Sequence, residues 1–385
     1  MRNKPTVIDL FSGCGGLSRG FIDAGYEVLL GVDFDEMALK TFEKNHEGAI
    51  AFKGDLFKDE TIDEMAEVIN LRSVDVIIGG PPCQGFSLTG KRQEDDDRNK
   101  LFYSMVKAVE RFKPKAFVLE NVPGLATLYQ GKAKAAILEE FGKLGYTINF
   151  QVLYAPDYGI PQIRKRIFFV GLKDGANFEF PEPVHTPENY VTCEQAIGDL
   201  PSLQDGVGQA ITKYTTPATS EYQKKMRANS SVLLNHVGTV HTDHVISVIR
   251  QVPEGGNHKD LPPGVGDSRK FNEAWTRYHS QKPSRTIDTG HRNHFHYKWD
   301  RVPTVRENAR LQSFPDDFEF IGNKTQQYKQ VGNAVPPLLG YHLAKKLQPY
   351  LHNYSCLYII FIYLQDVVVY QRVFIKILII ISLLQ

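Results

Sequence analysis

The chain has 385 residues, of which 42% are hydrophobic and 23% are charged, and 45 Lys and Arg residues nearly balance 44 Asp and Glu residues. These values are ordinary for a soluble globular protein, and the length allows two domains. The formal net charge of +1 excludes attraction of nucleic acid by bulk charge, so a polyanion would have to bind a local patch.

The first 170 residues alternate short apolar runs with stretches of helical spacing, which predicts a parallel sheet with crossover helices. The predicted strands are 7–10, 28–32, 74–78 and 116–119, and the predicted helices are 17–24, 36–45, 62–70, 101–112 and 134–144. Runs 146–153 and 166–172 are expected to form a terminal antiparallel pair. Because a doubly wound sheet holds its ligands at the carboxyl ends of its strands, the motifs found there are the candidates for function.

A glycine turn follows the first predicted strand, in the segment DLFSGCGGL, where Gly13, Gly15 and Gly16 allow the backbone to approach a ligand closely. Position 18 is Ser, where the dinucleotide-binding fingerprint of nicotinamide enzymes has a third glycine. No GxxxxGK[ST] segment is present either. Asp33 and Asp55 end the next two strands, and each alone could be an ordinary cap. Together with the turn they fit a ribose and an adenine without a pyrophosphate, which predicts S-adenosylmethionine as the cofactor.

Cys83 lies in GGPPCQGFS, a loop directly after the predicted strand 74–78. Reactive thiols are found in such loops, although a lone cysteine there is more often inert. The next strand ends in VLENV, which in a parallel sheet brings Glu120 and Asn121 beside the Cys83 loop. A carboxyl group at an apolar strand end tends toward a raised pKa and can hold or donate a proton. A thiolate and a protonated acid beside a methyl donor suggest methyl transfer to a ring carbon activated by covalent addition.

The four cysteines are far apart and form no CxxC pair, which favours a reducing compartment and argues against a structural metal site. Eight of the twelve histidines lie between His236 and His296. Because no finger-like spacing accompanies them, they are expected at the surface or against nucleic acid, and no metal is expected.

The two ends of the chain carry further expectations. The N-terminus predicts no signal peptide, so the protein is expected to be cytoplasmic. The apolar tail 351–385 lacks the run of roughly 20 apolar residues that spans a membrane. It is expected to be an odd extension or a strand-forming tail rather than a membrane anchor, and it receives no role.

Seven motifs follow one another between residues 5 and 349: FSGCGG, GVDFD, GGPPCQGFS, ENV, QIRKRIFFVG, PSRTI and QVGNAVPP. In these motifs the chain resembles the DNA cytosine-5 methyltransferases of bacterial restriction-modification systems. The resemblance implies an α/β fold: a doubly wound, mostly parallel, Rossmann-like sheet of the S-adenosylmethionine-dependent methyltransferases, with an inserted, loop-rich, mainly β target recognition domain. It implies a discontinuous catalytic domain (1–180 plus 301–350) and a recognition domain (181–300), with the QVGNAVPP helix packed beside the first motif. The tail 351–385 has no counterpart.

The same resemblance assigns roles to residues of the active site. Cys83 would attack carbon 6 of the target cytosine, Glu120 would hydrogen-bond ring nitrogen 3, and Asn121 would order the Cys83 loop. Arg164 and Arg166 would support the cytosine and that loop. The residues implied to bind the cofactor are Phe11, Gly13, Gly15, Gly16, Leu17, Asp33, Asp55, Pro82, Asn333 and Val335.

The implied DNA contacts fall in two segments. The segment 87–100, which includes Ser87, would close over DNA, with Arg98 on the phosphate backbone. Thr239 and Val240 would be a Thr-plus-aliphatic pair near the flipped base, for which an ordinary turn is an equally good interpretation.

Double-stranded DNA is the expected substrate, from which a cytosine must be extruded before it can react. A separate cognate restriction endonuclease is the expected partner, and the chain is expected to be a monomer. Two other functions stay open. Enzymes that methylate transfer RNA have PPCQPFT in the active loop, where this chain has QGFS, and a DNA-binding relative without catalysis would not need Cys83 and Glu120. The sequence leaves the recognition site unreadable.

Overall fold

The computed structural model describes residues 4–82, 97–128, 130–173, 175–265, 274–290 and 293–351, although the side chains of 97–100 are not described. Met1–Lys346 form one compact unit, and Leu347–Gln385 form a second unit, of which the end of one helix is described. Cys83, Ser87 and nearly all of the tail therefore lie outside the described residues. Within them, no helix is long and apolar enough to cross a membrane.

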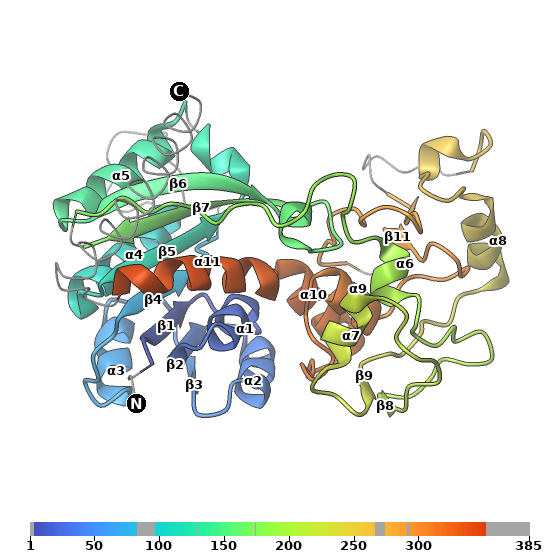
Figure 1. Ribbon diagram of the computed structural model, residues 1–385, viewed down its shortest axis with the longest axis horizontal. Helices are drawn as coiled ribbons and strands as arrows, with labels where there is room; N and C mark the ends of the chain where they lie inside the picture. Colours follow the sequence, from blue (N-terminus) through green and yellow to red (C-terminus); the bar gives the residue numbers. More distant parts are fainter. Residues whose placement is uncertain are drawn as a thin grey trace, which may run out of the picture. The chain divides into compact units, whose positions relative to one another are not determined.

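A seven-stranded sheet in the order β3-β2-β1-β4-β5-β7-β6 dominates the first unit (Figure 1). The strands are β1 (Thr6–Leu10), β2 (Glu27–Asp33), β3 (Ile50–Lys53), β4 (Val76–Gly79), β5 (Ala116–Asn121), β6 (Thr147–Tyr154) and β7 (Lys165–Leu172). The first five strands pair in parallel, whereas β7 runs antiparallel to both β5 and β6. The predicted doubly wound sheet and its terminal antiparallel pair are thus confirmed.

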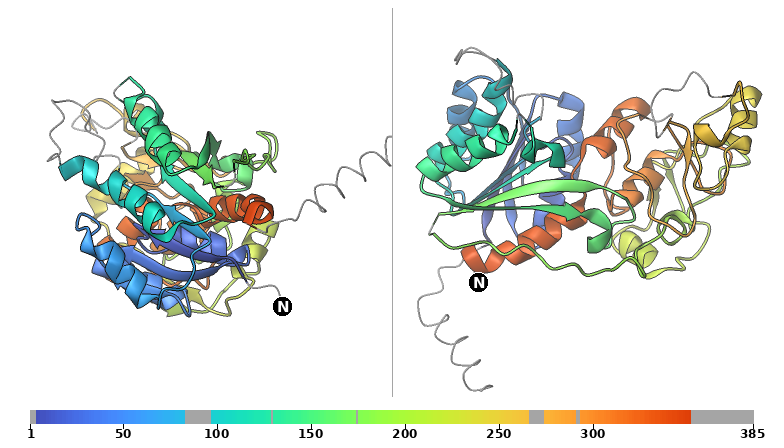
Figure 2. Two further views of the ribbon diagram at one scale, coloured as in Figure 1. Left: turned by 90° about the vertical axis from the view of Figure 1, so that its left-hand side faces the viewer. Right: turned by 90° about the horizontal axis from the view of Figure 1, so that it is seen from above.

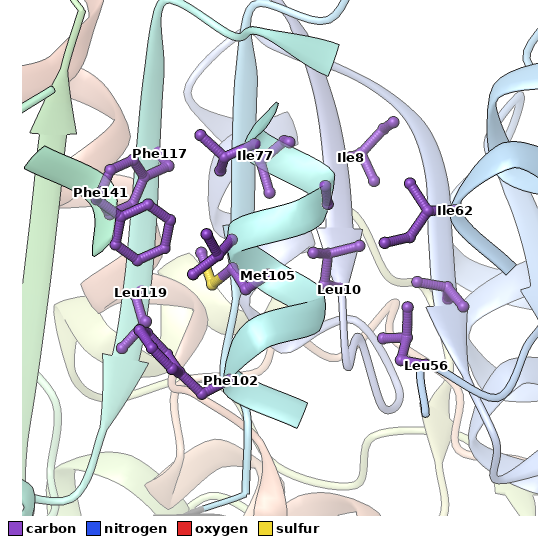
Figure 3. Close-up of a cluster of buried hydrophobic side chains, with 14 of the residues drawn as sticks. Ile8, Leu10, Leu56, Ile62, Ile77, Phe102, Met105, Phe117, Leu119 and Phe141 are labelled. Atoms are coloured by element: carbon purple, nitrogen blue, oxygen red, sulfur yellow. The ribbon is translucent and has the colours of Figure 1, made fainter. Parts of the chain in front are cut away.

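Five helices connect the strands: α1 (Gly16–Asp23), α2 (Glu36–Asn45), α3 (Glu60–Val68), α4 (Asp97–Phe112) and α5 (Lys132–Lys143). The last three lie along one face of the sheet (Figure 2) and share one apolar cluster with the strands. In this cluster Met105 and Phe102 of α4 meet Ile77, Leu10 and Leu119 (Figure 3). Full burial of one such side chain is worth about 1.5–3 kcal/mol, so this cluster is the main source of stability for the sheet.

The segment 181–300 is loop-rich, as expected, but it is not mainly β. Its described elements are α6 (Cys193–Ile197), β8 (Ile211–Thr212), α7 (Glu221–Arg227), β9 (Leu233–Leu234), α8 (Asp243–Gln251), β10 (Thr276–Arg277) and β11 (His294–Phe295). Each of these strands has two residues, so the described helices cover more of the segment than the strands do. Frequent Pro, Gly and turn-forming residues interrupt the chain before a longer strand can pair.

Three helices follow in the C-terminal part: α9 (Val305–Leu311), α10 (Lys324–Asn333) and α11 (Pro337–Leu351). Every residue of α9 is buried, including Arg306, Glu307 and Arg310. Arg310 makes two hydrogen bonds to Asp316, at 2.8 and 2.6 Å, and a third, of 2.5 Å, to Asp199. These buried charges are therefore neutralised in pairs, as burial requires.

Arg301 and Glu307 form a second buried ion pair at the start of α9. Both guanidinium Nη atoms of Arg301 donate to the Glu307 carboxylate, each at 2.7 Å. Burial acts to raise the pKa of Glu307, but the charges of the surrounding Arg and His residues and the hydrogen bonds from Arg301 together outweigh it, and the pKa falls below its usual range. Glu307 also closes the capping box of α9, where it accepts from the backbone N–H of Thr304 at 2.7 Å. The start of α9 is thus fixed by the same carboxylate that neutralises Arg301.

The segment 316–322 is bonded on two sides. On one side, Asn235 makes two hydrogen bonds to the backbone of Phe320, at 2.8 and 2.9 Å. On the other, Asn45 of α2 makes two to the backbone of Glu319, at 2.8 and 2.7 Å, and Thr41 accepts from the N–H of Ile321 at 2.9 Å. This segment therefore joins the 181–300 region to the helix that follows β2.

Three of the eight clustered histidines contradict the expectation of a surface or nucleic-acid position. His236, His294 and His296 are buried. His236 bonds Thr304 and the carbonyl of Pro201, at 2.9 and 2.8 Å. Nδ1 of His296 accepts two backbone N–H groups, and burial lowers the pKa of this histidine to about 3. The sequence could not distinguish these histidines, because a neutral imidazole with backbone partners is as stable inside as outside.

Candidate active site and cofactor site

Glu120 and Asn121, at the carboxyl end of β5, contact the backbone that leads into the Cys83 loop. β4 and β5 pair in parallel up to Gly79, so the residues that follow each strand are neighbours. Asn121 donates from Nδ2 to the carbonyl of Pro81 at 2.8 Å. A Cβ at Gly80 would lie 2.9 Å from Oε2 of Glu120, so a larger residue there would displace this carboxylate from its present position. Both side chains thus contact the residues that lead into this loop, Gly80 and Pro81, while Cys83 itself lies outside the described residues.

The Glu120 carboxylate is largely but not fully shielded from solvent, and it is paired. Its side chain is 12% exposed, and Nε of Arg166 lies 2.8 Å from Oε1. Burial raises the pKa of Glu120, and the charges of Arg166 and Arg164 only partly oppose this. A carboxyl group whose pKa is raised in this way can carry a proton at a higher pH than an exposed glutamate can. The site therefore contains an acid that is held in place by an arginine.

Arg164 precedes β7 and points elsewhere. Its guanidinium is 2% exposed and donates from Nη2 to the carbonyls of Gly332 and Ala334, at 3.1 and 3.2 Å. Burial lowers the pKa of Arg164 to about 9. Its buried Nε has no hydrogen-bond partner among the described residues. Arg164 thus ties β7 to the QVGNAVPP segment, while Arg166 faces the Glu120 carboxylate.

The glycine turn after β1 is fixed by Asp33. Oδ2 of Asp33 accepts from the N–H of Gly13 at 2.8 Å, and Oδ1 accepts from the N–H of Asp35 at 2.9 Å. Gly13 and Gly15 have φ values of 53° and 88°, the left-handed region that favours glycine. The side of Gly13 where a Cβ would stand is open, with no atom within 4 Å. Asp33 therefore lies directly beside the turn, as the motif predicted.

His46, which no sequence motif indicated, contacts the backbone of Gly15. Nε2 of His46 lies 3.0 Å from the carbonyl oxygen of Gly15, and Nδ1 lies 2.7 Å from that of Phe42. A Cβ at Gly15 would be 2.2 Å from the His46 ring. Burial lowers the pKa of His46 to about 4, so the neutral ring can donate to one of these carbonyls. A lone histidine at a helix end gives no sequence signal for this contact.

The first and last motifs meet at close range, as expected. A Cβ at Gly16 would lie 2.4 Å from the carbonyl oxygen of Val335, and one at Gly20 would lie 2.3 Å from that of Pro337. The backbones of α1 and of the start of α11 can approach this closely only because both positions are glycine. Asn333, the last residue of α10, is exposed beside them.

The remaining residues predicted to bind the cofactor differ in exposure. Asp55 and Pro82 are exposed, Phe11 is half-buried in a left-handed conformation (φ 58°), and Leu17 is buried. Asp55 accepts from the N–H of Phe57 at 3.0 Å, so it shapes its own turn.

Two exposed aromatic side chains, which the sequence did not single out, follow these acidic residues. Phe34, next to Asp33, is 72% exposed, and Phe57, two residues after Asp55, is 44% exposed. The sequence feature that could have indicated these two side chains is an aromatic residue within one or two positions after each strand-end aspartate.

The predicted DNA contacts are only partly described by the structure. Arg98 lies in α4, but its side chain is outside the described ones. Thr239 accepts from Nζ of Lys324 at 3.4 Å, and Val240 is 81% exposed. A different threonine, Thr286, donates to the carbonyl of Ile163, one residue before Arg164, at 2.5 Å.

The fold and the site together define a class. A doubly wound sheet in which β7 lies antiparallel between β5 and β6, with a glycine turn after β1 and an acid at the end of β2, is the Rossmann-like fold of methyltransferases. Residues 5–349 match the family model of the C-5 cytosine-specific DNA methylases, and the chain belongs to this family.

Relatives align over most of the chain. It is 43% identical over 347 residues to the Type II methyltransferase M1.HphI of Haemophilus parahaemolyticus, covering 88% of this chain and 86% of that protein. It is 37% identical over 375 residues to M.DdeI of Desulfomicrobium norvegicum, covering 90% and 89%.

Solved structures have the same fold. A protein encoded within an E. coli prophage, solved as a DNA modification methyltransferase, superposes with a TM-score of 0.74 at 28% identity, covering 90% of this chain and 99% of that one. The Dnmt2 methyltransferase of S. pombe, at 16% identity and a TM-score of 0.59 over 90% of this chain and 99% of that one, shares the fold.

Proposed function

We propose that this chain is the DNA (cytosine-5-)-methyltransferase of a Type II restriction-modification system. It would methylate carbon 5 of a cytosine that is flipped out of a short specific duplex sequence, and so protect DNA from a separate cognate endonuclease. The observation that carries the proposal is the Glu120–Arg166 pair beside Gly80 and Pro81, at the start of the loop that holds Cys83. The two relatives described above, of Haemophilus parahaemolyticus and Desulfomicrobium norvegicum, are both Type II methyltransferases.

S-adenosylmethionine fits the residues at the end of β1 and β2. The side of Gly13 where a Cβ would stand is open, and the buried hydroxyl of Ser12 has no partner among the described residues. The Asp33 oxygens each accept one backbone N–H, which leaves lone pairs for ribose hydroxyls. The exposed rings of Phe34 and Phe57 supply apolar surface for an adenine. When bound, the cofactor supplies an electrophilic methyl group on a sulfonium centre.

The chain's own residues would activate the cytosine. The Cys83 thiolate forms a bond to carbon 6, and the electron pair of the 5,6 double bond moves into the ring. Protonated Glu120, hydrogen-bonded to nitrogen 3, stabilises the negative charge that this addition creates. Carbon 5 would then be nucleophilic and accept the methyl group, whose bond to the sulfonium sulfur breaks with its electron pair staying on that sulfur, so that the thioether S-adenosylhomocysteine leaves. The C5–H bond would then break and give its proton to water, and its electron pair would form the 5,6 double bond as the bond to Cys83 breaks and restores the thiolate.

Arginine contacts would keep this acid in position. Arg166 fixes the orientation of the Glu120 carboxylate at 2.8 Å, whereas Arg164, bonded to Gly332 and Ala334, would fix the distance between the base site and the cofactor site. Asn121 would order the Cys83 loop through the carbonyl of Pro81. Arg164 and Asn121 are therefore positioning residues in this proposal, and Cys83 and Glu120 are the catalytic ones.

DNA recognition would be divided along the chain. We assign 1–180 plus 301–350 to catalysis and 181–300 to target recognition. The Thr-plus-aliphatic pair near the flipped base would be Thr286 and Ile287 rather than Thr239 and Val240. The reason is that Thr286 bonds the carbonyl of Ile163 and the N–H of Ile287 bonds Gln162, in the segment that carries Arg164.

Bisulfite sequencing of plasmid DNA from cells that express the chain tests the function. We expect protected cytosines at one short repeated sequence, and none in cells that express Cys83→Ala. Glu120→Gln should reduce methylation by at least 100-fold, because general acid catalysis typically contributes 10²–10⁴-fold, while binding of duplex DNA is retained. DNA with 5-fluorocytosine at the target should trap a denaturation-resistant adduct with wild type but not with Cys83→Ser.

The matched control is Glu140→Gln, which removes a carboxylate of α5 that is paired at the surface with Lys143 and should leave methylation unchanged. The absence of protected cytosines despite folded protein would refute DNA methylation. Methyl uptake by total RNA would then support the RNA alternative, and equal DNA binding by wild type and Cys83→Ala without any product would support a non-catalytic relative.

A further inference from the structure

Gln312 is a fully buried glutamine at the carboxyl end of α9. Its Nε2 donates to the carbonyl of Ala334 at 2.6 Å, and its Oε1 accepts from Nε2 of Gln162. Gln162 precedes β7 and is also fully buried, whereas Ala334 lies between α10 and α11. One amide side chain therefore links the segment that leads into β7 to the QVGNAVPP segment.

Gln162 is a fixed anchor for this link. Its Nε2 also donates to the carbonyl of Leu311 at 3.3 Å. Its Oε1 accepts from the N–H of Ile287 at 3.1 Å and from Nη1 of Arg164 at 3.5 Å. Both polar atoms of this side chain thus have two partners each, so its orientation is set by three separate parts of the chain. Gln312 is therefore bonded to a side chain that cannot turn away without breaking several buried hydrogen bonds.

Ala334, at the other end of the link, lies between two residues predicted to bind the cofactor and packs against the start of α1. A Cβ at Gly16 would lie 3.1 Å from Cβ of Ala334 and 2.4 Å from the carbonyl oxygen of Val335. The carbonyl of Ala334 accepts from Gln312 at 2.6 Å and from Nη2 of Arg164 at 3.2 Å. Two buried side chains therefore hold one carbonyl of the segment 333–335, and Gln312 makes the shorter bond.

We propose that Gln312 is a positioning residue that holds the segment 333–335 in the conformation that binds S-adenosylmethionine. This inference rests on the proposed function, which assigns that cofactor. A binding segment that is already fixed loses less conformational freedom when its ligand binds, so the affinity is higher than for a segment that the ligand must order. Without Gln312 the carbonyl of Ala334 would keep the longer bond from Arg164, and the cofactor would have to order the segment. The cost should therefore appear in cofactor affinity and not in the chemical step.

The test variant is Gln312→Met, which keeps the length of the side chain and removes both of its hydrogen bonds. The carbonyl of Ala334 still accepts from Arg164. Nε2 of Gln162 still donates to the carbonyl of Leu311. Because each former partner keeps another hydrogen bond, we expect the variant to fold.

Calorimetric titration with S-adenosylmethionine, in the absence of DNA, measures the effect. The Kd of Gln312→Met should be about 3- to 10-fold above that of wild type, which corresponds to the loss of one neutral hydrogen bond. In steady-state methylation the KM for S-adenosylmethionine should rise by a similar factor. The KM for DNA, and kcat at saturation with both substrates, should stay within about twofold of wild type.

The matched control is Gln223→Met in α7. Gln223 is likewise fully buried, and its Oε1 accepts from the backbone N–H groups of Thr219 and Ser220, at 2.7 and 3.2 Å. Its replacement opens the capping box of α7 and should lower the Tm at least as much as Gln312→Met does. The Kd for S-adenosylmethionine should nevertheless stay at the wild-type value, so this control separates a loss of stability from a loss of positioning.

An unchanged Kd in Gln312→Met, or an equal rise in Gln223→Met, would overturn the inference. A KM for DNA that rises together with the KM for S-adenosylmethionine would also overturn it, because it would show a general disturbance of the structure. Since the titration needs neither DNA nor turnover, a failure here differs from a failure of the proposed function, in which wild type methylates no cytosine.

Discussion

The sheet and the C-terminal segment around α9 hide their interiors from water in opposite ways. In the main apolar cluster of the sheet the buried side chains come from five strands (β1, β2, β4, β5 and β7), from the helices α3, α4 and α5, and from the loops between them. Around α9 the buried side chains include Arg301, Arg306, Glu307, Arg310 and Asp316. An apolar core gains free energy in proportion to the area buried, whereas a buried ion pair roughly balances desolvation against attraction. The first interior therefore tolerates small losses, and the second fails when a single charge is removed.

Removal of one charge from the α9 network should have the largest effect. Asp316→Ala removes the carboxylate that accepts two hydrogen bonds from the Arg310 guanidinium. We expect a loss of about 3–5 kcal/mol in the free energy of unfolding. Chemical denaturation at pH 7 measures it. Asp63→Ala, which breaks a pair at the surface with Arg111, is the control and should cost under about 1 kcal/mol. Similar losses for both would contradict the comparison.

The same variant predicts a pH dependence. Burial acts to raise the pKa of Asp316, but the charges of Arg310 and Arg306 and the hydrogen bonds from Arg310 and Tyr214 together outweigh it and lower the pKa below its ordinary value. A carboxylate with a lowered pKa stabilises the fold above the pKa of the unfolded chain, about 3.9, and this contribution is lost as the pH falls through the folded pKa. The difference in stability between wild type and Asp316→Ala should thus be largest near pH 7 and shrink below about pH 4. A constant difference from pH 7 to pH 3 would show that the charge of Asp316 is not responsible.

An intermediate effect is expected where α1, which follows the first strand of the sheet, packs against the start of α11 in the C-terminal part of the chain. Gly20→Ala places a Cβ 2.3 Å from the carbonyl oxygen of Pro337 and 2.5 Å from the N–H nitrogen of Tyr341. Both are backbone atoms, so α1 must move away from α11, at a cost of about 1–3 kcal/mol. Thermal unfolding and the Kd for S-adenosylmethionine should both worsen. Gly142→Ala in α5, where no atom lies within 4 Å of the new Cβ, should instead gain up to about 1 kcal/mol from helix propensity.

The smallest effect belongs to the apolar sheet. Ile77→Val removes one methylene from a fully buried side chain of β4 and should cost about 0.5–1.5 kcal/mol. The cost should be the same at pH 7 and pH 4, because no charge is involved. Denaturant unfolding at both pH values checks this, with Ile211→Val, at an exposed position, as a control near zero. A cost that changed with pH would mean that the sheet and the charged network are coupled.

Much of the sheet could be predicted from the sequence, because apolar runs and helical spacing are local signals. The same holds for Glu120 and Asn121, since adjacent parallel strands bring the residues after them together. The buried charges of α9 could not be predicted, because a helix rich in Arg and Glu has the composition of an exposed helix. The contacts of Arg164 with Gly332 and Ala334 depend on residues far apart in the chain, which no local pattern reveals.

The bonds of the 316–322 segment set limits on how this protein can be recombined with its relatives. Exchange of the whole 181–300 region would replace Asp199 and Asn235, which bond Arg310 of α9 and the backbone of Phe320, and both of these stay behind. A chimaera built with those boundaries would leave Arg310 with only one of its two carboxylate partners and the backbone of Phe320 without the bonds of Asn235. Grafts that retain Asp199, Asn235 and His236, and exchange only the exposed loops between them, keep the hydrogen bonds between the 181–300 region and the C-terminal part of the chain. New sequence specificity can then be introduced without rebuilding the interior.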